Sequence, residues 1–254
     1  MAQTEHSRSA AAVLERERPG SRRPWVLRWC IAAAIAVAGV CYSSWVLEFV
    51  LPIGLDPVDS FLSELDAEGR PYGWVFSTAD TIAGSLTLAA ALGGLVAFPR
   101  RRLSTVGWVA LGCFGAATIA DAQWPIEPCA GSCDNGLLPQ LHQVHALTST
   151  LAVTSIFVAM IAFSAAAFRY RDWPILRHSG LWIVVLGMAA TAWMLIADNL
   201  TGDYALGIAQ RIQVGAMSLW LVALAVQVGL VTGGGRARRP ASAAPTTRRP
   251  PTRP

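Results

Sequence analysis

Six long apolar segments alternate with short polar ones along most of this chain. They cover residues 25–47, 73–98, 105–122, 141–168, 180–198 and 208–231, and each is bounded by proline, glycine or charge. Each is close to the ~20 residues that an α-helix needs to cross a hydrocarbon core of ~30 Å. The two-residue alternation of polarity that marks a membrane-spanning barrel strand is not present. The pattern therefore predicts an all-α fold, a bundle of six transmembrane helices.

Composition agrees with a membrane protein and excludes an ordinary soluble domain. Hydrophobic residues make up 54% of the chain and charged residues only 14%, whereas a soluble domain carries about a quarter charged residues. Residues 1–24 and 233–254 have no sustained apolar face, so we expect two disordered tails that flank one transmembrane domain, residues 25–232. The first apolar segment exceeds the ~7–15 apolar residues of a cleaved signal peptide, and we expect it to be retained.

Charge is distributed unevenly between the two sides of the predicted bundle. Every arginine except Arg70 and Arg211 falls on the side of the termini, and most acidic residues fall on the other side. The positive-inside rule then predicts that both termini lie in the cytoplasm. The basic C-terminal tail lacks the aromatic or folded context of a nucleic-acid site, so its expected partner is the anionic lipid surface and not nucleic acid.

Polar side chains recur at the outer ends of several predicted helices. Such groups cost something like 2.5–3.5 kcal/mol each in lipid and normally face a bundle interior. We therefore expect an outward-facing polar pocket in which Arg211 neutralises one or more of the nearby aspartates. The predicted pocket residues on the helices are Asp80, Asp121, His142, His145, Asp198, Gln210 and Arg211, and a short covering helix in the first outer loop adds Ser63 and Glu64.

Two histidines permit a second interpretation of the same region. His142 and His145 are three residues apart, so a helix would place them on one face, and Asp121 would complete a metal-ligand set. Zinc accepts such a set with one position open for water, and the site would then support metal-assisted hydrolysis. Zinc is the one cofactor that the pattern suggests. A hydrogen-bonded cluster that only fixes helix packing is the alternative.

The chain has five cysteines, of which only Cys129 and Cys133 lie in a predicted polar loop. The outer side of the membrane is oxidising, and the Ala-Gly-Ser spacer between the two residues permits a tight turn. We therefore expect a short-loop disulfide between Cys129 and Cys133. A metal site that uses both thiols is the other interpretation.

Four short motifs resemble a known family. They are Ser63-Glu64-Leu65, Asp121-Ala-Gln-Trp-Pro125, His145 at the start of the fourth helix, and Gly207-Ile-Ala-Gln-Arg211. They are similar to those of the bacterial membrane proteins grouped as domain of unknown function 998 (DUF998), over about residues 29–231. The resemblance implies a six-helix protein of the bacterial inner membrane and supplies no reaction. A more distant similarity, to the alkaline ceramidase and adiponectin-receptor group, implies zinc held by histidines, but a third histidine in the right place is missing here.

These observations support three hypotheses about function. The first is that the outward-facing pocket binds a lipid or small amphiphile. The second is a zinc-dependent membrane hydrolase of lipid amides or esters, and the third is a structural or assembly protein whose polar groups only pair with one another. Membrane lipids are partners in all three. Small-residue stretches such as Gly93-Gly94 are compatible with a homo-oligomer as well as with close packing inside one chain.

Overall fold

The computed structural model describes residues 23–126, 144–171, 173–197, 199–200 and 204–233. Within these ranges the protein is all-helical, and six helices are long and apolar enough to cross a membrane. They are built on α2 (Arg23–Cys41), α3 (Gly73–Ala97), α4 (Arg102–Gln123), α5 (Val144–Tyr170), α6 (Leu181–Ala197) and α7 (Leu206–Gly233), and the π-helix Leu176–Gly180 lengthens α6 at its start. The predicted fold class is confirmed, and the predicted helix ends are close to the observed ones except at the end of the first helix.

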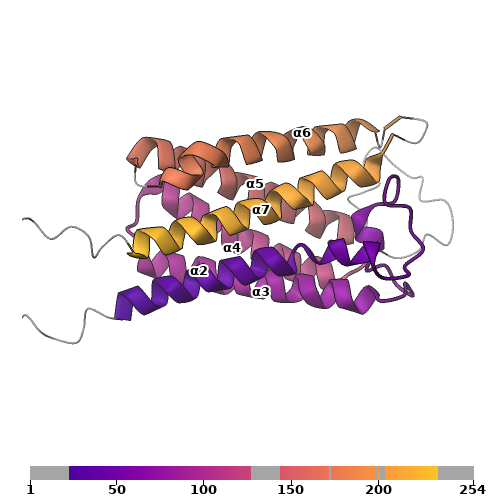
Figure 1. The fold of residues 1–254 in the computed structure, drawn as a ribbon, viewed down its shortest axis with the longest axis horizontal. Coiled ribbons are helices and arrows are strands. Elements are labelled where there is room, and N and C mark those ends of the chain that lie inside the picture. Colours follow the sequence, from indigo (N-terminus) through magenta and orange to yellow (C-terminus); the bar gives the residue numbers. More distant parts are fainter. Residues whose placement is uncertain (1–22, 127–143, 172, 198, 201–203, 234–254) are drawn as a thin grey trace, which may run out of the picture.

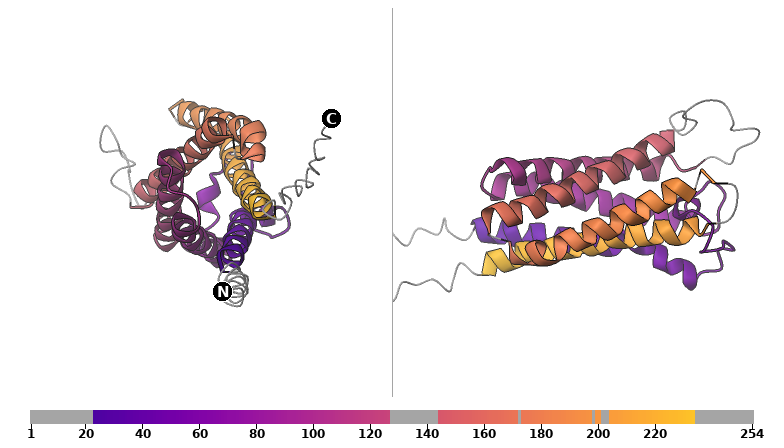
Figure 2. Two further views of the ribbon diagram at one scale, coloured as in Figure 1. Left: turned by 90° about the vertical axis from the view of Figure 1, so that its left-hand side faces the viewer. Right: turned by 90° about the horizontal axis from the view of Figure 1, so that it is seen from above.

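The helices form one ring in the order of the chain (Figure 1, Figure 2). α2 packs against α3 and α7, α4 lies between α3 and α5, and α6 packs along α7 while it touches α5 only weakly. The beginning of α2 and the end of α7 lie at the same end of the bundle, which we call the terminal end (Figure 1). The long loop between α2 and α3 lies at the opposite end, which we call the loop end.

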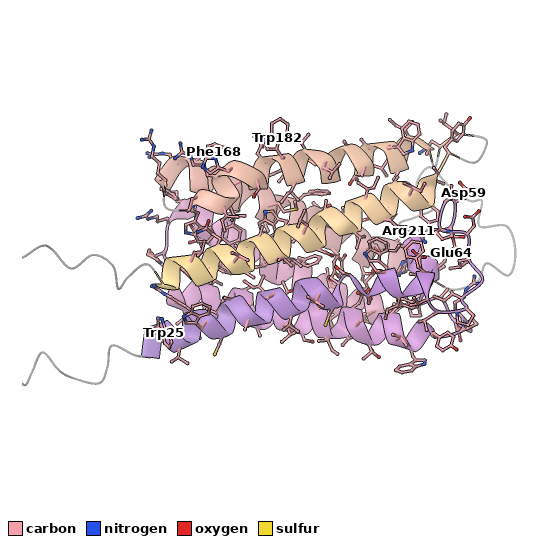
Figure 3. All side chains as sticks on the ribbon, viewed as in Figure 1. Trp25, Asp59, Glu64, Phe168, Trp182 and Arg211 are labelled. Atoms are coloured by element: carbon pink, nitrogen blue, oxygen red, sulfur yellow. The ribbon has the colours of Figure 1, made fainter. Side chains whose placement is uncertain are left out.

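Aromatic side chains fill the ring in the half nearer the terminal end. Phe163 of α5 is fully buried, and its ring centroid lies 5.0 Å from that of Trp108, 5.3 Å from that of Trp173 and 6.0 Å from that of Trp220. Phe98 stacks on Trp108 at 5.5 Å. We call these five residues the aromatic cluster. Other aromatic side chains, including Phe168 and Trp182, point out of the ring instead (Figure 3).

Helices α3 and α4 touch backbone to backbone at two glycines. A Cβ atom on Gly115 would lie 2.6 Å from the carbonyl oxygen of Gly84, and a Cβ atom on Gly84 would lie 2.7 Å from the carbonyl oxygen of Gly115. No side chain fits at either position without moving a backbone. These two glycines thus serve packing within one chain, as small residues do between membrane helices. A homo-oligomer stays a prediction.

The first apolar segment is not one continuous helix, contrary to the prediction. α2 ends at Cys41, and after a short turn the chain continues as a 3-10 helix, Ser44–Phe49. The hydroxyl of Ser43 donates to the carbonyl oxygen of Gly39 at 2.9 Å, which is the way serine side chains compete with regular helical bonding. The tighter winding turns Trp45 and Glu48 toward the interior of the ring, where both contribute to the site described next.

Candidate functional site

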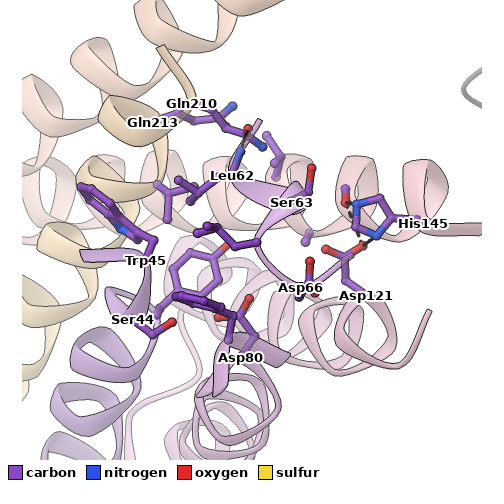
Figure 4. Close-up of a pocket in the computed structure, with 17 residues that line it drawn as sticks. Ser44, Trp45, Leu62, Ser63, Asp66, Asp80, Asp121, His145, Gln210 and Gln213 are labelled. Carbon is purple, nitrogen blue, oxygen red and sulfur yellow. Dashed lines mark hydrogen bonds and ion pairs between the residues drawn. The ribbon is translucent and has the colours of Figure 1, made fainter. Parts of the chain in front are cut away.

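A polar cavity lies inside the ring at the loop end (Figure 4). The cavity volume is about 90 Å³. The segment after α2, the loop between α2 and α3, and the helices α3, α4, α5 and α7 all contribute to its wall. Its polar lining residues are Tyr42, Ser44, Ser63, Asp66, Asp80, Asp121, His145, Ser149, Gln210 and Gln213.

Several of the predicted pocket residues line this cavity, and others lie elsewhere. Ser63, Asp80, Asp121, His145 and Gln210 face it. Their use in ligand binding stays a prediction. The remaining predicted residues His142 and Asp198, and the predicted disulfide partners Cys129 and Cys133, lie outside the residues that the structure describes.

The prediction that Arg211 neutralises a pocket aspartate is wrong for Asp80 and Asp121, and the third predicted partner, Asp198, lies outside the residues that the structure describes. Its Nε and Nη2 atoms donate to the two carboxylate oxygens of Glu48 at 2.6 Å and 2.5 Å, and its Nη1 atom donates to the carbonyl oxygen of Ser60 at 2.9 Å. The Arg211 and Glu48 side chains are only 7% and 3% exposed. Two of the three nitrogen atoms thus form a buried, two-pronged ion pair with Glu48, and the third holds the loop at Ser60. The guanidinium does not line the cavity.

The start of α7 fastens the loop between α2 and α3 over the cavity. Gly207 makes this possible, because a Cβ atom there would lie 2.5 Å from the carbonyl oxygen of Ser60. The bonds across this contact run from Leu62 N to Gln210 Oε1 at 2.6 Å, from Ala205 N to Asp59 Oδ1 at 3.2 Å and from Ile208 N to Val58 O at 3.2 Å. The motif Gly207-Ile-Ala-Gln-Arg211 thus forms the surface of α7 to which the loop is bound.

Within the loop, Ser63 and Glu64 have different roles. The expected covering helix is a single 3-10 turn, Leu62–Glu64, and Ser63 faces the cavity from it. The Glu64 carboxylate instead accepts a hydrogen bond from the backbone N–H of Phe61 at 2.9 Å and lies 4.0 Å from the guanidinium of Arg70. Glu64 therefore stabilises the turn that presents Ser63 and does not line the cavity.

Asp121, at the end of α4, accepts hydrogen bonds from polar side chains of α5. Its Oδ1 atom accepts hydrogen bonds from the hydroxyls of Thr148 at 2.6 Å and Ser149 at 2.7 Å. The same oxygen lies 3.3 Å from Nδ1 of His145, which also faces the carbonyl oxygen of Trp124 at 3.1 Å. Both neighbours of Nδ1 are acceptors, so Nδ1 carries a hydrogen and donates it. Asp121 and His145 are thereby fixed relative to each other.

Carboxylates dominate the charge of the cavity. Asp66, Asp80 and Asp121 line it, and His145 is the single lining residue able to become a cation among the residues described. Burial raises the pKa of Asp66 to about 6; the nearby His145 lowers this pKa and Asp121 raises it. With Arg211 paired to Glu48, the cavity suits a ligand group that is positively charged or donates hydrogen bonds.

The raised pKa of Asp66 predicts a dependence of stability on pH. Because the pKa is 3.8 for an ordinary aspartate and about 6 here, the folded protein binds this proton more tightly than the unfolded chain does. Asp66 therefore stabilises the fold at low pH, and this contribution is lost as the pH rises through about 6. We expect Asp66→Asn to match the wild type in thermal unfolding near pH 4 and to exceed it near pH 7. A difference that does not change with pH would contradict this assignment.

A metal-ligand set is not found in the part of the chain that the structure describes. No group of three or more histidine, cysteine, aspartate or glutamate side chains there is arranged to hold a metal ion. Of the predicted zinc ligands, Asp121 and His145 meet in the cavity, and His142 lies outside the described ranges. The zinc site stays a prediction.

Six apolar helices arranged around an internal acidic cavity define a multi-pass integral membrane protein. The chain belongs to the family described as Protein of unknown function (DUF998), whose model matches residues 35–227. This confirms the resemblance drawn from the motifs. Neither the curated proteins nor the solved structures contain a match to the chain. The family does not supply a reaction, so a function has to be argued from the site.

Several residues of the site were not identified from the sequence, among them Glu48, Ser149 and Asp66. Glu48 was the only acid near the end of the first apolar segment, and its isolation was a usable signal. Ser149 follows His145 by four residues, a spacing that places two side chains on one face of a helix. Asp66 stood in a loop with several other acids, and nothing in the local pattern distinguishes it from them.

Proposed function

We propose that this protein binds the polar head group of a lipid or small amphiphile in the cavity, which faces the outer side of the membrane. The observation that supports this most directly is the convergence of Asp66, Asp80, Asp121 and His145, from four different segments, on one cavity. The distribution of arginines supports the orientation, because the terminal end carries nearly all of them.

The lining favours a particular kind of ligand. The carboxylates favour a head group that carries an amine or several hydroxyls, because charge-assisted hydrogen bonds are the stronger ones. Gln213 is held in place by a 2.6 Å bond from its Nε2 atom to the hydroxyl of Thr191. Apolar lining residues, among them Phe76, Val153 and Val214, suit the adjoining hydrocarbon part of an amphiphile.

Replacing Asp80 should weaken binding of such a head group. A hydrogen bond to a charged group contributes about 1.5–3 kcal/mol, so we expect Asp80→Asn to weaken binding of a lipid with a primary-amine head group about tenfold or more. Binding can be measured by native mass spectrometry of the purified protein, with a lipid of equal chain length and an anionic glycerol head group as the comparison. Wild-type protein should prefer the amine.

Asp56→Asn is the matched control for this experiment. Asp56 is an exposed residue of the same loop, and its carboxylate accepts a bond from the backbone N–H of Val58 at 2.9 Å, away from the cavity. Equal binding by the wild type and Asp80→Asn would exclude the cavity as the site. Stoichiometric zinc in the purified protein would instead favour the hydrolase with Asp121, His142 and His145 as ligands.

A further inference from the structure

Ser149 and His145 form a pair on one face of α5. They are four residues apart, so they lie one above the other on the helix, and both line the cavity. The Oγ atom of Ser149 lies 3.4 Å from Nε2 of His145. Figure 4 shows the His145 ring between the α5 ribbon and Asp121, at the edge of the cavity.

The hydrogen on Nδ1 decides what the other ring nitrogen can do. Nδ1 lies 3.1 Å from the carbonyl oxygen of Trp124 and 3.3 Å from a carboxylate oxygen of Asp121. Both oxygens are acceptors, so neither can donate a hydrogen to Nδ1. A neutral imidazole with its hydrogen on Nδ1 has a lone pair on Nε2. Nε2 is therefore the basic atom, and it is the one that faces the Ser149 hydroxyl. This is the division of roles in serine hydrolases, where a third group orients the histidine.

In the structure the Ser149 hydroxyl donates to Asp121 and not to His145. Thr148 donates to the same Asp121 oxygen at 2.6 Å, so Asp121 keeps a donor when Ser149 turns away. Redirecting the Ser149 proton to Nε2 needs only rotation of the hydroxyl hydrogen. The 3.4 Å separation is long for a hydrogen bond, and such distances shorten when substrate binds.

We propose that the cavity cleaves carboxylic esters of the amphiphiles that it binds, with Ser149 as nucleophile, His145 as general base and Asp121 as the residue that positions His145. This rests on the binding function proposed above. Ser149 Oγ bonds to the acyl carbon while His145 Nε2 takes the hydroxyl proton. The ester C–O bond then breaks, and the alcohol leaves with that proton. Water attacks the acyl group on Ser149, gives its proton to Nε2, and the carboxylic acid leaves as the proton returns to Ser149.

The charge of the cavity narrows the substrate class. Acidic side chains line the cavity, and among the described lining residues only His145 is able to become a cation, so an anionic phosphodiester is disfavoured relative to a carboxylic ester. The oxyanion of the ester reaction needs hydrogen-bond donors. Ser63 and Gln210 line the same cavity, and their side chains carry a hydroxyl and an amide donor. The substrate class is therefore a carboxylic ester of an alcohol whose head group is neutral or cationic.

A fluorophosphonate probe tests the proposal on the purified, full-length protein. Ser149 Oγ would bond to phosphorus, fluoride would leave, and His145 would take the proton. We expect an adduct that mass spectrometry places on Ser149 in the wild type, no adduct at that position in Ser149→Ala, and labelling about a hundredfold slower in His145→Gln. Thr150→Ala is the matched control, because Thr150 is an exposed residue of the same helix whose hydroxyl donates to the carbonyl oxygen of Ala146 at 2.7 Å, and it should label within about threefold of the wild type.

Asp121 acts through His145, so its test needs a readout other than rate alone. In Asp121→Asn we expect labelling of Ser149 to slow as it does in His145→Gln, and in Asp121→Glu, which keeps a carboxylate, we expect part of the rate to return. Equal labelling by Asp121→Asn and Asp121→Glu would contradict the positioning role.

Absence of an adduct on Ser149 in folded wild-type protein would overturn the proposal, as would undiminished labelling in Ser149→Ala. Folding is checked by size-exclusion chromatography and by binding of the amine-head-group lipid. Wild-type protein that binds this lipid but is not labelled would remove the catalytic proposal and leave the binding function standing. Labelling of Ser149 in the wild type, together with equal lipid binding by the wild type and Asp80→Asn, would remove the binding function and leave the catalytic proposal standing.

Discussion

Replacing Arg211 by alanine is expected to lower the free energy of unfolding by about 3–5 kcal/mol, because it leaves the buried Glu48 carboxylate without a partner. The Arg211 and Glu48 side chains are 7% and 3% exposed, and both carboxylate oxygens are bonded to the guanidinium. The carbonyl oxygen of Ser60 also loses its donor. The loop over the cavity should loosen at the same time, which limited proteolysis would detect.

Arg70→Ala is the matched control for this prediction. Its guanidinium lies 4.0 Å from Glu64, and both side chains are about one-third exposed at 32% and 33%, so the loss should be within about 1 kcal/mol. Both variants can be compared by chemical unfolding in detergent micelles. The double variant Glu48→Leu with Arg211→Leu should recover much of the loss, because an apolar pair can replace a buried ion pair. Equal destabilisation by Arg211→Ala and Arg70→Ala would show that the Arg211–Glu48 ion pair does not hold the loop in place.

Phe163→Ala is the second change with a large expected effect, a loss of about 3–5 kcal/mol. Phe163 is fully buried in the aromatic cluster, in contact with Trp108, Trp173 and Trp220. In a membrane the unfolded helices stay in an apolar solvent, so the loss comes from the cavity and from missing packing contacts. Thermal unfolding in detergent would measure it.

Phe168→Ala on the same helix is the control, because Phe168 is 48% exposed and points out of the ring. We expect a change within about 0.5 kcal/mol. If the two substitutions were equally harmful, the aromatic cluster would not be the packing centre of the bundle.

The helices could be predicted from the sequence because crossing a bilayer imposes a length and a polarity that local composition reveals. Gly73 and Ala97 bound α3 almost where the apolar run begins and ends. The break after Cys41 could not be predicted in this way, since Ser43 and Ser44 stand in an apolar run that continues to Leu47 without a charge, a proline or a glycine. There the hydroxyl of Ser43 bonds to the backbone of the preceding turn, and a hydropathy pattern does not reveal such a bond.

Only part of the site could be predicted from the sequence, for a related reason. Position along a helix gives depth in the membrane, which is why Asp80, Asp121 and His145 could be expected at one level. Which side chains meet also depends on the rotation of each helix about its own axis, and the hydropathy pattern does not define that rotation. Arg211 therefore pairs with Glu48, whose direction is set by the 3-10 helix after α2.

The aromatic cluster closes the interior of the bundle on the side nearer the terminal end. Below the acidic cavity, within the residues described, the ring is closed by the stacked rings around Phe163. A molecule at Asp80 is therefore separated from the terminal end by buried aromatic side chains. For the binding function proposed above, we expect the ligand to enter and leave at the loop end, so that any signal that depends on occupancy belongs to one side of the membrane.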